Sequence, residues 1–454
     1  MIERLYNAYL RSHAVTTDSR AITPGCIFFA FRGGHFDGNA FALQALAQGA
    51  ALCIVSEEWK AESGPAGADE RIIGVPDVLA TLQALARHHR RHLTIPVVGI
   101  TGTNGKTTTK ELVTAVLAKR YKTSATRGNF NNHLGVPLTL LAIPEGTEIA
   151  IVEMGANHPG EIAFLCSIAD PDCGLITNVG RAHLEGFGSF EGVIQTKTEL
   201  YRHLATKEGT VFVNADNATL MERLPRNTRS ITYGTATQAA AVHGSHVTNN
   251  PFMKFYFEVL DNVYTVQTHL LGAYNFDNCM AAVAVGLHFG VEPWDIKEAI
   301  EEYVPSNQRS EYRESARGNR LYLDCYNANP SSMAAAISSF ATMINGKWKT
   351  ENGEQAATPG DSPLTMAVIG GMHELGAAEQ QEHERVIGQL ADCRLERVLL
   401  VGPEWAPLPH PDNMLPFPDT EAVATHLKEH PVSGATILVK GSNTNRLWTL
   451  EGLL

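Results

Sequence analysis

The sequence predicts an α/β protein built from three domains. A chain of 454 residues is longer than one hydrophobic core supports, because chains beyond about 250 to 300 residues divide into domains. Short apolar runs alternate with amphipathic stretches along most of the chain, which is the pattern of parallel sheets covered by helices. Pro96 and a polar segment near Arg309 interrupt this alternation. We therefore expect domains at residues 1–93, 94–312 and 313–454.

The first domain is predicted to be a small α/β unit. Apolar runs at 27–31 and 51–55 predict two buried strands, and a helical pattern from 40 to 48 lies between them. Another apolar run, at 72–75, predicts a further strand. An amphipathic stretch at 77–91 predicts the helix that leads into the second domain.

The second domain is predicted to contain a parallel sheet. Strand-like segments at 97–101, 149–155 and 174–180 alternate with helical patterns, which implies crossover helices between parallel strands. Such sheets bind ligands at the carboxyl ends of their strands. Residues 279–287 are apolar on every side and predict a buried helix that still belongs to this domain.

The third domain is predicted to be Rossmann-like, because strands and helices alternate again. A polar run from 345 to 363 interrupts the pattern and is expected to be a surface loop without function. The expected strands lie at 321–326, 365–371, 397–402 and 435–441, and the expected helices follow Pro330, Ala378 and Asp419.

Composition argues against several classes of protein. The formal net charge is -12 and no long block of Lys or Arg occurs, so nucleic acid is not expected as a partner. No segment approaches the ~18 to 20 apolar residues of a membrane span. The seven cysteines are scattered and never spaced C-x-x-C, which argues against a disulfide framework or a Cys-based zinc site. We expect an unexported cytoplasmic protein with reduced thiols.

A glycine-rich loop after the strand at 97–101 predicts a phosphate-binding site. Its glycines permit a tight turn that points backbone N–H groups inward, and the following helix N-terminus adds partial positive charge. Lys106 would reach the terminal phosphates, and Thr107 would present its hydroxyl to Mg²⁺. The pattern G-x-x-x-x-G-K-[ST] is met only as a variant, because Ile100 stands in place of the first glycine. The expected nucleotide-binding residues here are Gly102, Thr103, Asn104, Gly105, Lys106, Thr107 and Thr108.

The phosphate loop alone indicates nucleotide binding and not a reaction. A kinase, a GTPase or a non-catalytic nucleotide-dependent scaffold protein would also use such a loop. The residues outside the loop have to decide between these classes.

The variant TGTNGKT at 101–107 resembles the nucleotide loop of the Mur ligase family. Four further blocks strengthen the resemblance across nearly the whole chain: GNFNNHLGVP from Gly128, VEMGANHPGEI from Val152, NVGRAHLEGFGS from Asn178 and DCYNANPSSM from Asp324. The last block, together with GANHPGEI, resembles the member that adds D-alanyl-D-alanine. The resemblance implies ATP-dependent amide bond formation on a UDP-N-acetylmuramoyl tripeptide, through an acyl phosphate, in peptidoglycan synthesis.

The resemblance also implies a magnesium site made of strand-end residues. Glu153 and His183 match the family residues that hold the metal. A carboxylate suits this hard cation, whereas a histidine is a less usual ligand. Lys197 matches the lysine that the family carbamylates, which implies an anion able to bind a second Mg²⁺. With Lys106, these three are the implied catalytic residues.

The resemblance assigns further contacts with ATP and with the two substrates. Asn275 matches the family's adenine-contacting asparagine, although it would also serve as a helix N-cap. Arg309 matches an arginine that reaches ATP phosphate, and Asp324 matches a ribose-contacting aspartate. The implied substrate-binding residues are Ser19, Arg20, Gly34, Asp37 and Gly38 for the uridine nucleotide, Asn131 and Asn132 for the muramoyl side, and Tyr326, Asn327 and Asn329 in the third domain.

Two departures from the family pattern fall in the third domain. Gly371 stands where G-D-M-x-E-L-G has its aspartate, and Asn443 stands where K-G-S-R has its arginine. Arg446 is a nearby guanidinium that could replace the second. Contacts with the dipeptide in this domain are therefore open.

Two related ligases are the nearest alternatives. The ligase that adds the third amino acid carries a DNPR signature, which is absent here. Folylpolyglutamate synthase shares the loop but would leave the N-terminal uridine-type domain without a purpose. Whether the tripeptide ends in lysine or diaminopimelate stays open, and we expect a monomer.

Overall fold

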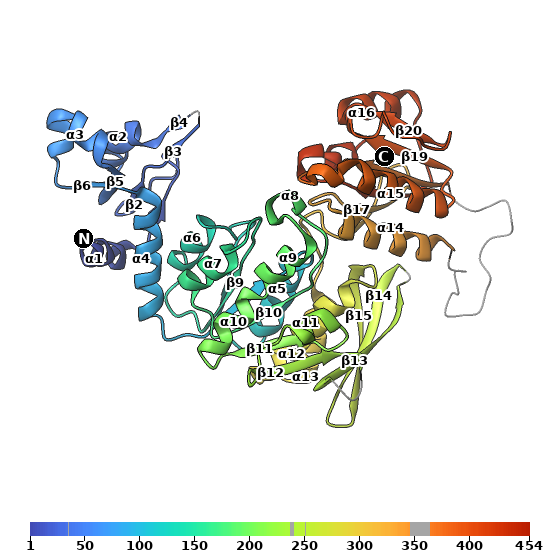
Figure 1. The fold of residues 1–454 in the computed structure, drawn as a ribbon, viewed down its shortest axis with the longest axis horizontal. Coiled ribbons are helices and arrows are strands. Elements are labelled where there is room, and N and C mark those ends of the chain that lie inside the picture. The colour runs from blue at the N-terminus through green and yellow to red at the C-terminus, as the bar shows by residue number, and fades with distance from the viewer. Residues whose placement is uncertain (35, 237–239, 250, 346–363) are drawn as a thin grey trace.

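The computed structural model describes residues 1–34, 36–236, 240–249, 251–345 and 364–454. Three sheets follow one another along the chain, each with its own helices (Figure 1). The α/β class and the three-part organisation expected from the sequence are present. Within the described residues, no helix is long and apolar enough to cross a membrane. All seven cysteines are buried with free thiols.

The first sheet is parallel and has the order β1-β2-β5-β6. The predicted helix at 40–48 is shorter than expected, because Asp37 caps a 3₁₀ turn at Gly38–Phe41 and the α-helix begins only afterwards. The strands are β1 Val15–Thr16, β2 Ile27–Phe29, β5 Leu52–Ser56 and β6 Ile72–Val75, with the hairpin β3 Arg32–Gly33 and β4 Phe36–Asp37. The helices are α1 Ile2–Ser12, α2 Ala42–Ala47, α3 Glu57–Glu62 and α4 Val78–His92.

Helix α4 joins the first sheet to the central part of the chain. It begins where Asp77 accepts a hydrogen bond from the N–H of Ala80. Its apolar residues belong to one hydrophobic cluster that continues into the central domain. Figure 1 shows α4 alongside α6 Gly135–Leu141 and α7 Glu161–Ala169, against which it packs.

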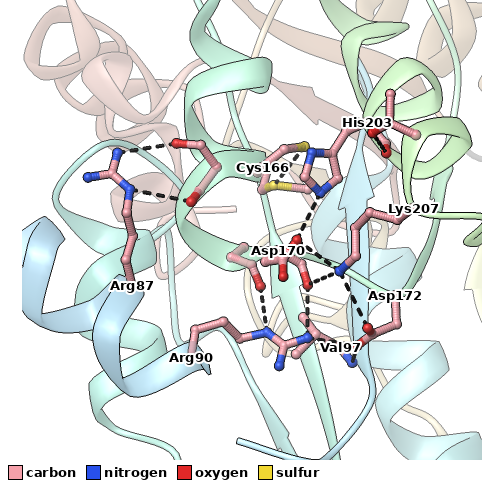
Figure 2. A network of polar contacts seen from close by, with 12 residues as sticks. Arg87, Arg90, Val97, Cys166, Asp170, Asp172, His203 and Lys207 are labelled. Carbon is pink, nitrogen blue, oxygen red and sulfur yellow. Dashed lines mark hydrogen bonds and ion pairs between the residues drawn. The ribbon is translucent and has the colours of Figure 1, made fainter. Parts of the chain in front are cut away.

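A buried arginine completes this junction (Figure 2). The side chain of Arg90 is 8% exposed and donates to the carbonyls of Ala169 at 2.9 Å and Asp170 at 2.8 Å, and to the carboxylate of Asp172 at 2.8 Å. Asp172 also accepts from the N–H of Val97, the first residue of the central sheet, at 2.8 Å. The end of α4 is thereby tied to the sheet that carries the phosphate loop.

The central sheet has nine strands in the order β15-β14-β13-β12-β11-β10-β7-β9-β8. From β8 to β13 neighbouring strands are parallel, as expected. The strands are β7 Val97–Thr101, β8 Thr123–Ala125, β9 Ile149–Glu153, β10 Cys173–Ile176, β11 Thr210–Asn214, β12 Arg229–Gly234, β13 Val242–Asn249, β14 Phe252–Val259 and β15 Asn262–Leu271. The remaining helices are α5 Lys106–Ala118, α8 Leu184–Phe187, α9 Phe190–Lys197, α10 Glu199–Thr206, α11 Ala218–Glu222, α12 Asn275–His288 and α13 Pro293–Glu302.

Strands β13, β14 and β15, which pair antiparallel, extend this parallel sheet and were not predicted from the sequence. Strand β14 alternates buried and half-buried residues, which is typical of a sheet with one covered face. Leu260 and Asp261 have φ angles of 47° and 64°. Two successive positive φ values make the two-residue turn that suits a hairpin. The buried helix predicted at 279–287 is confirmed as part of α12.

The third sheet has the order β16-β17-β21-β18-β19-β20, parallel except for the edge strand β16. Strand β16 spans Glu311–Glu314, so it crosses the expected boundary between 312 and 313. The expected loop at 345–363 lies, apart from Asn345, outside the described residues. The other elements are β17 Arg320–Asp324, β18 Thr365–Gly370, β19 Arg397–Val401, β20 Met414–Phe417, β21 Thr436–Lys440, α14 Pro330–Asn345, α15 Glu379–Asp392 and α16 Thr420–Glu429.

Candidate active site

A cavity of ≈ 1120 Å³ lies at the carboxyl ends of the central parallel strands and is also lined by the third domain. This is the edge at which parallel sheets bind ligands. Most of the residues expected to form the site meet there, although they come from distant parts of the sequence. The expected site residues that line it are Thr103, Asn104, Gly105, Lys106, Thr107, Thr108, Asn131, Asn132, Glu153, His183, Asn275, Arg309, Asp324, Tyr326 and Asn327.

Neighbouring side chains that pack closely against the backbone explain the glycines of the phosphate loop. A Cβ at Gly102 would lie 2.0 Å from Oγ1 of Thr177, and a Cβ at Gly105 would lie 2.5 Å from Oδ1 of Asn278. Both glycines also have positive φ, 148° and 77°, which favours glycine. Ile100 is fully buried in β7, so the position of the missing first glycine belongs to the hydrophobic core.

The loop is held by the end of β10. Asn178 accepts through its carbonyl from the N–H of Thr103 at 3.0 Å and through its side chain from the N–H of Asn104 at 3.0 Å. The hydroxyl of Thr177 donates to the carbonyl of Asn104 at 2.6 Å. These hydrogen bonds hold the loop in place before α5 begins.

Lys106 lies folded over the phosphate loop. Its Nζ donates to the carbonyls of Gly102 and Thr103, each at 2.8 Å. Burial lowers the pKa of Lys106 to about 8, Glu153 opposes this shift and Arg309 adds to it. The ammonium is therefore a cation near its titration point, and an arriving polyphosphate would stabilise its charged form.

Glu153 has the surroundings expected of a metal ligand. Its side chain is 1% exposed, and Oε1 accepts from Nδ2 of Asn131 at 2.8 Å and from Oγ1 of Thr107 at 3.3 Å. Its other oxygen, Oε2, has no hydrogen-bond partner among the described residues. A buried carboxylate oxygen without a donor is costly unless a ligand satisfies it. Together with the Thr107 hydroxyl, these oxygen donors fit Mg²⁺.

Lys197 is buried at the end of α9, just behind the cavity wall. Its Nζ donates to the carbonyl of Ala156 at 3.2 Å and lies 5.4 Å from the ring centre of Phe187. Burial, followed by repulsion from Lys106, holds the pKa of Lys197 well below its usual range. Burial therefore favours the neutral amine over the ammonium at this position.

His183 meets the third domain. Its Nδ1 contacts the carboxylate of Glu374, which leaves Nε2 for another ligand. Burial lowers the pKa of His183, and the Glu374 contact opposes this shift. A carboxylate at Nδ1 is the partner that metal-binding histidines usually have.

The expected ATP contacts gather around the linker between the second and third sheets. Asn275 is the first residue of α12 rather than its N-cap, and its Nδ2 donates to the carbonyl of Leu271 at 2.7 Å. The guanidinium of Arg309 lies over the ring of Tyr326, 3.9 Å from its centre. Asp324 pairs with the buried Lys440 at 2.9 Å.

The substrate residues expected in the central and third domains have local partners. Asn132 accepts from the N–H groups of Leu134 and Gly135, so it forms the turn before α6. The carbonyl of Asn327 accepts from Lys440 at 2.6 Å. Asn329 does not line the cavity, but its Nδ2 donates to Oδ1 of Asn104 at 2.8 Å and so ties the third domain to the phosphate loop.

The expected uridine residues lie in the first domain, away from this cavity. Arg20 is largely exposed and pairs with Asp18 at 2.8 Å, and this contact lowers the pKa of Asp18 to about 2. Asp37 caps the 3₁₀ turn, and a Cβ at Gly38 would lie 2.6 Å from the carbonyl of Phe31. Local structure therefore explains Asp37 and Gly38 without a ligand. Ser19, Arg20, Gly34, Asp37 and Gly38 are absent from the cavity lining.

Arg446, which was expected to replace the arginine missing from K-G-S-R, does not line the cavity. Asn443 and Arg446 are both exposed, and neither is among the lining residues. Arg446 follows a 3₁₀ turn with a φ of 53°. Arg309 is the arginine that does line this cavity.

Sequence reasoning missed several residues that shape the site. Thr177 and Asn178 hold the loop, Asn278 packs against Gly105, and Lys440 pairs with Asp324. Two of them stand in sequence blocks that were already recognised. Asn178 begins the block NVGRAHLEGFGS, and Lys440 begins the block KGSN, which has an asparagine in place of the K-G-S-R arginine. Their partners could be found only from the fold.

Known proteins resemble this chain along nearly its whole length. The model described as Mur ligase middle domain matches residues 100–286, and the model described as Mur ligase family, catalytic domain, matches residues 11–90. The UDP-N-acetylmuramoyl-tripeptide--D-alanyl-D-alanine ligase of Bacillus subtilis is 32% identical over 450 residues, covering 96% of this chain and 91% of the relative. The ligase of the same name from Escherichia coli is 34% identical over 449 residues, covering 97% and 93%.

Solved structures agree with these relatives. A crystal structure of MurF from Acinetobacter baumannii has a TM-score of 0.82 at 29% identity, covering 96% of this chain and 92% of that one. MurF from Thermotoga maritima in complex with ADP has a TM-score of 0.81 at 28% identity, covering 97% and 96%. Full-length relatives above 30% identity and the two matching domain models lead to one conclusion: this chain belongs to the Mur ligase family.

Proposed function

We propose that this chain is an ATP-dependent ligase that joins D-alanyl-D-alanine to a UDP-N-acetylmuramoyl tripeptide in peptidoglycan synthesis. One observation carries the proposal: the phosphate loop and the buried Glu153 carboxylate line one cavity between two domains, and the buried Lys197 donates to the carbonyl of the lining residue Ala156. Full-length relatives from Bacillus subtilis and Escherichia coli carry the name of this reaction. A scaffold protein would have no need of the catalytic groups.

The first step activates the tripeptide. Its terminal carboxylate oxygen attacks the γ-phosphorus of ATP, the bond to the β-phosphate oxygen breaks, and ADP leaves behind an acyl phosphate. Negative charge on the transferring group is offset by Lys106 and by the N–H groups of the phosphate loop. Arg309, which lines the same cavity, supplies a second cation.

The second step forms the amide. The neutral amine of the dipeptide attacks the acyl carbon, and the tetrahedral intermediate expels inorganic phosphate while the nitrogen loses its extra proton to solvent. The cavity lies between the central and third domains. Docking of the third domain would therefore bring the dipeptide amine to the acyl phosphate, and such orientation lowers barriers by several kcal/mol in favourable cases.

Magnesium fits the oxygen donors at the strand ends. We propose that Thr107, Glu153 and His183 hold it, with the Glu153 oxygen that lacks a partner among the described residues as the principal ligand. When bound, the ion would offset charge on the ATP phosphates.

Lys197 supports a second site. We propose that its neutral amine adds to carbon dioxide, forming an N–C bond and releasing a proton, so that the amine becomes a carbamate anion. The low pKa that burial imposes on Lys197 favours this reaction. The anion would attract a second Mg²⁺, which the ammonium would repel.

The remaining proposals assign one domain, with its binding residues, to each of the three sheets. We propose residues 1–93, 94–312 and 313–454 as the uridine-binding, ATP-binding and Rossmann-like ligase domains, with the first sheet carrying the anchor at Ser19, Arg20, Gly34, Asp37 and Gly38. Asn131 and Asn132 would meet the muramoyl side of the substrate. Asn275 and Asp324 would meet the nucleoside of ATP, and Tyr326, Asn327 and Asn329 the dipeptide side.

The reaction suits a monomer that works in the cytoplasm, where ATP and nucleotide-linked precursors are made. We propose that its partners are these small molecules and not nucleic acid, in keeping with the net charge of -12.

Phosphate release with substrates omitted one at a time tests the function. We expect full turnover only with ATP, Mg²⁺, UDP-muramoyl tripeptide and D-Ala-D-Ala together, and a product of pentapeptide mass. Tripeptides ending in lysine and in diaminopimelate would be compared in parallel. Equal turnover with glutamate and a folate, or with the muramoyl dipeptide and a diamino acid, would contradict the proposal in favour of a related ligase.

A further inference from the structure

The turn after β18 brings the third domain to the metal-site histidine. It runs from Gly371 to Leu375, and its Glu374 contacts Nδ1 of His183. Met372 anchors the turn, because its N–H donates to Nε2 of the buried His383 at 3.0 Å. The placement of this turn therefore decides whether Glu374 reaches His183.

Glu404, in the loop after β19, inserts its carboxylate beside this turn. A Cβ at Gly371 would lie 2.6 Å from Oε2 and 2.7 Å from Cδ of Glu404, and a Cβ at Gly402 would lie 2.1 Å from Oε2. Both positions must therefore lack a side chain while Glu404 keeps this conformation. A carboxylate built on residue 371 would compete for the same volume.

The surroundings of Glu404 are unusual for a carboxylate that only packs. Its side chain is 13% exposed, and Oε2 has no hydrogen-bond partner among the described residues. Oε1 lies 3.7 Å from Nδ1 of His373, the neighbour of Glu374. Because a poorly solvated carboxylate is costly, an uncharged side chain would fill this space more cheaply.

We propose that Glu404 is a positioning residue that supplies, from the loop after β19, the carboxylate that position 371 lacks. Its carboxylate faces Nδ1 of His373 at 3.7 Å and thereby holds the turn that presents Glu374 to His183. The departure at Gly371 is then a relocation of a carboxylate, because the space that a side chain at 371 would need is filled by that of Glu404. The assignment to catalysis rests on the proposed ligase function.

Four variants separate charge from packing. Glu404→Gln keeps the shape and removes the charge, Gly371→Asp adds a second carboxylate to an occupied space, and Gly371→Asp/Glu404→Gln moves the charge to the other side of that space. The fourth, Glu384→Gln at an exposed position on α15, serves as the matched charge control. Each variant is followed by kcat and KM in the phosphate assay, by thermal unfolding, and by NMR of ¹⁵N-labelled histidines.

We expect Glu404→Gln to lower kcat about tenfold, a typical effect of removing an outer-shell partner, with KM for ATP and the melting temperature nearly unchanged. Gly371→Asp should lower both kcat and the melting temperature, because two carboxylates crowd one volume. The double variant should regain most of the wild-type kcat. Wild-type turnover in Glu404→Gln, or a double variant no better than either single one, would overturn the proposal.

The NMR measurement keeps this inference separate from the ligase function. Without substrates, the His183 Nδ1 signal should report its contact with Glu374 in the wild-type chain, lose it in Glu404→Gln and recover it in the double variant. If the wild-type chain catalyses no ligation but these signals change as expected, the proposed function fails and the positioning role stands. Unchanged His183 signals in Glu404→Gln would overturn the positioning role whatever the activity.

Discussion

The central domain meets its two neighbours through junctions of different kinds. The first junction, around α4, joins both sides in one hydrophobic cluster, and Arg90 is buried there against backbone carbonyls and Asp172. The second junction combines an apolar contact, in which Leu271 and Phe252 of the central sheet pack with the third domain's hydrophobic cluster, with polar contacts around a cavity. Its polar pairs are Asn104 with Asn329, Arg181 with Ser331 and Glu382, and His183 with Glu374.

We infer from this difference that the first junction contributes to stability and the second to catalysis. Apolar burial and a buried arginine favour one fixed arrangement of the first domain on the second. Polar groups that contact each other across a cavity can exchange those contacts for a ligand at little cost, because water and ligands offer equivalent hydrogen bonds. We therefore expect substitutions at the first junction to change stability, and substitutions at the second to change turnover.

The largest effect is expected at the phosphate loop, beside the second junction. Lys106→Ala should lower kcat by about 100- to 1000-fold, the cost of losing one preorganised charge at a transition state, and leave urea unfolding nearly unchanged. Because the pKa of Lys106 is about 8, ATP binding should weaken and take up protons as pH rises from about 7 to about 9, the range around that pKa. Calorimetry in two buffers measures that uptake, which should vanish in Lys106→Ala. Uptake that persists there would remove Lys106 from phosphate binding.

The second-largest effect is expected at Lys197. Lys197→Ala should lower kcat about 100-fold, because this residue is proposed to place an anion in the site. Lys197→Ala is expected to be nearly inactive and partly rescued by a short carboxylate in solution. In the wild-type chain, activity should fall at low pH, because protonation of the amine competes with carbamate formation even though burial lowers its pKa. Lys197→Arg keeps a positive charge and cannot form this carbamate. Full activity of that variant across pH would end the carbamate hypothesis.

Arg90→Ala probes the first junction and should act on stability. We expect the free energy of unfolding to fall by about 2 kcal/mol, because the change removes a donor from the carbonyls of Leu93, Ala169 and Asp170 and weakens the pairing of Asp172. Well below the melting temperature, kcat should stay near that of the wild type. Arg87→Ala is the matched control on the same helix, since Arg87 hydrogen-bonds to the carbonyl and hydroxyl of Ser167 and lies over the ring of Phe164. A large loss of kcat in Arg90→Ala would break the division between the junctions.

The smallest effect is expected for one hydrogen bond across the second junction. Ser331→Ala removes the acceptor of the Arg181 N–H, which now lies 2.8 Å away. We expect no more than about a fivefold change in kcat/KM, the worth of roughly one hydrogen bond, with unchanged urea unfolding. Ser338→Ala is the control, since Ser338 is exposed on the same helix, α14, and does not line the cavity. Equal effects of the two variants on kcat/KM would show that the contact across the junction contributes nothing specific.

Much of the fold could be predicted because local signals were strong. The buried strand β7 followed by Gly102, Gly105 and Lys106 indicates a phosphate loop within a few residues, and residues 279–287 of α12 are apolar on every side. The antiparallel pairing of β13 to β15 was missed, because strand direction depends on partners distant in the sequence. The Leu260-Asp261 turn carries no glycine to mark it.

The candidate site was predictable from the phosphate-loop pattern, which gave Lys106, and from the family resemblance, which implied Glu153 and Lys197. Lys106 and Glu153 line the cavity, and Lys197 donates to the carbonyl of the lining residue Ala156. Contacts across domains, such as His183 with Glu374, have no local signature because their members come from different sheets. The relation of Gly371 to Glu404 was equally hidden: the sequence shows a missing carboxylate, and only the fold shows another one beside it.

The central claim is that the cavity at the second junction activates a carboxylate as an acyl phosphate and passes it to the dipeptide amine. Turnover with a tripeptide whose terminal carboxylate carries ¹⁸O tests this most directly. The mechanism predicts one ¹⁸O atom in the inorganic phosphate for each pentapeptide formed, since the attacking oxygen leaves with the phosphate. Phosphate free of ¹⁸O, or phosphate released without pentapeptide, would contradict it.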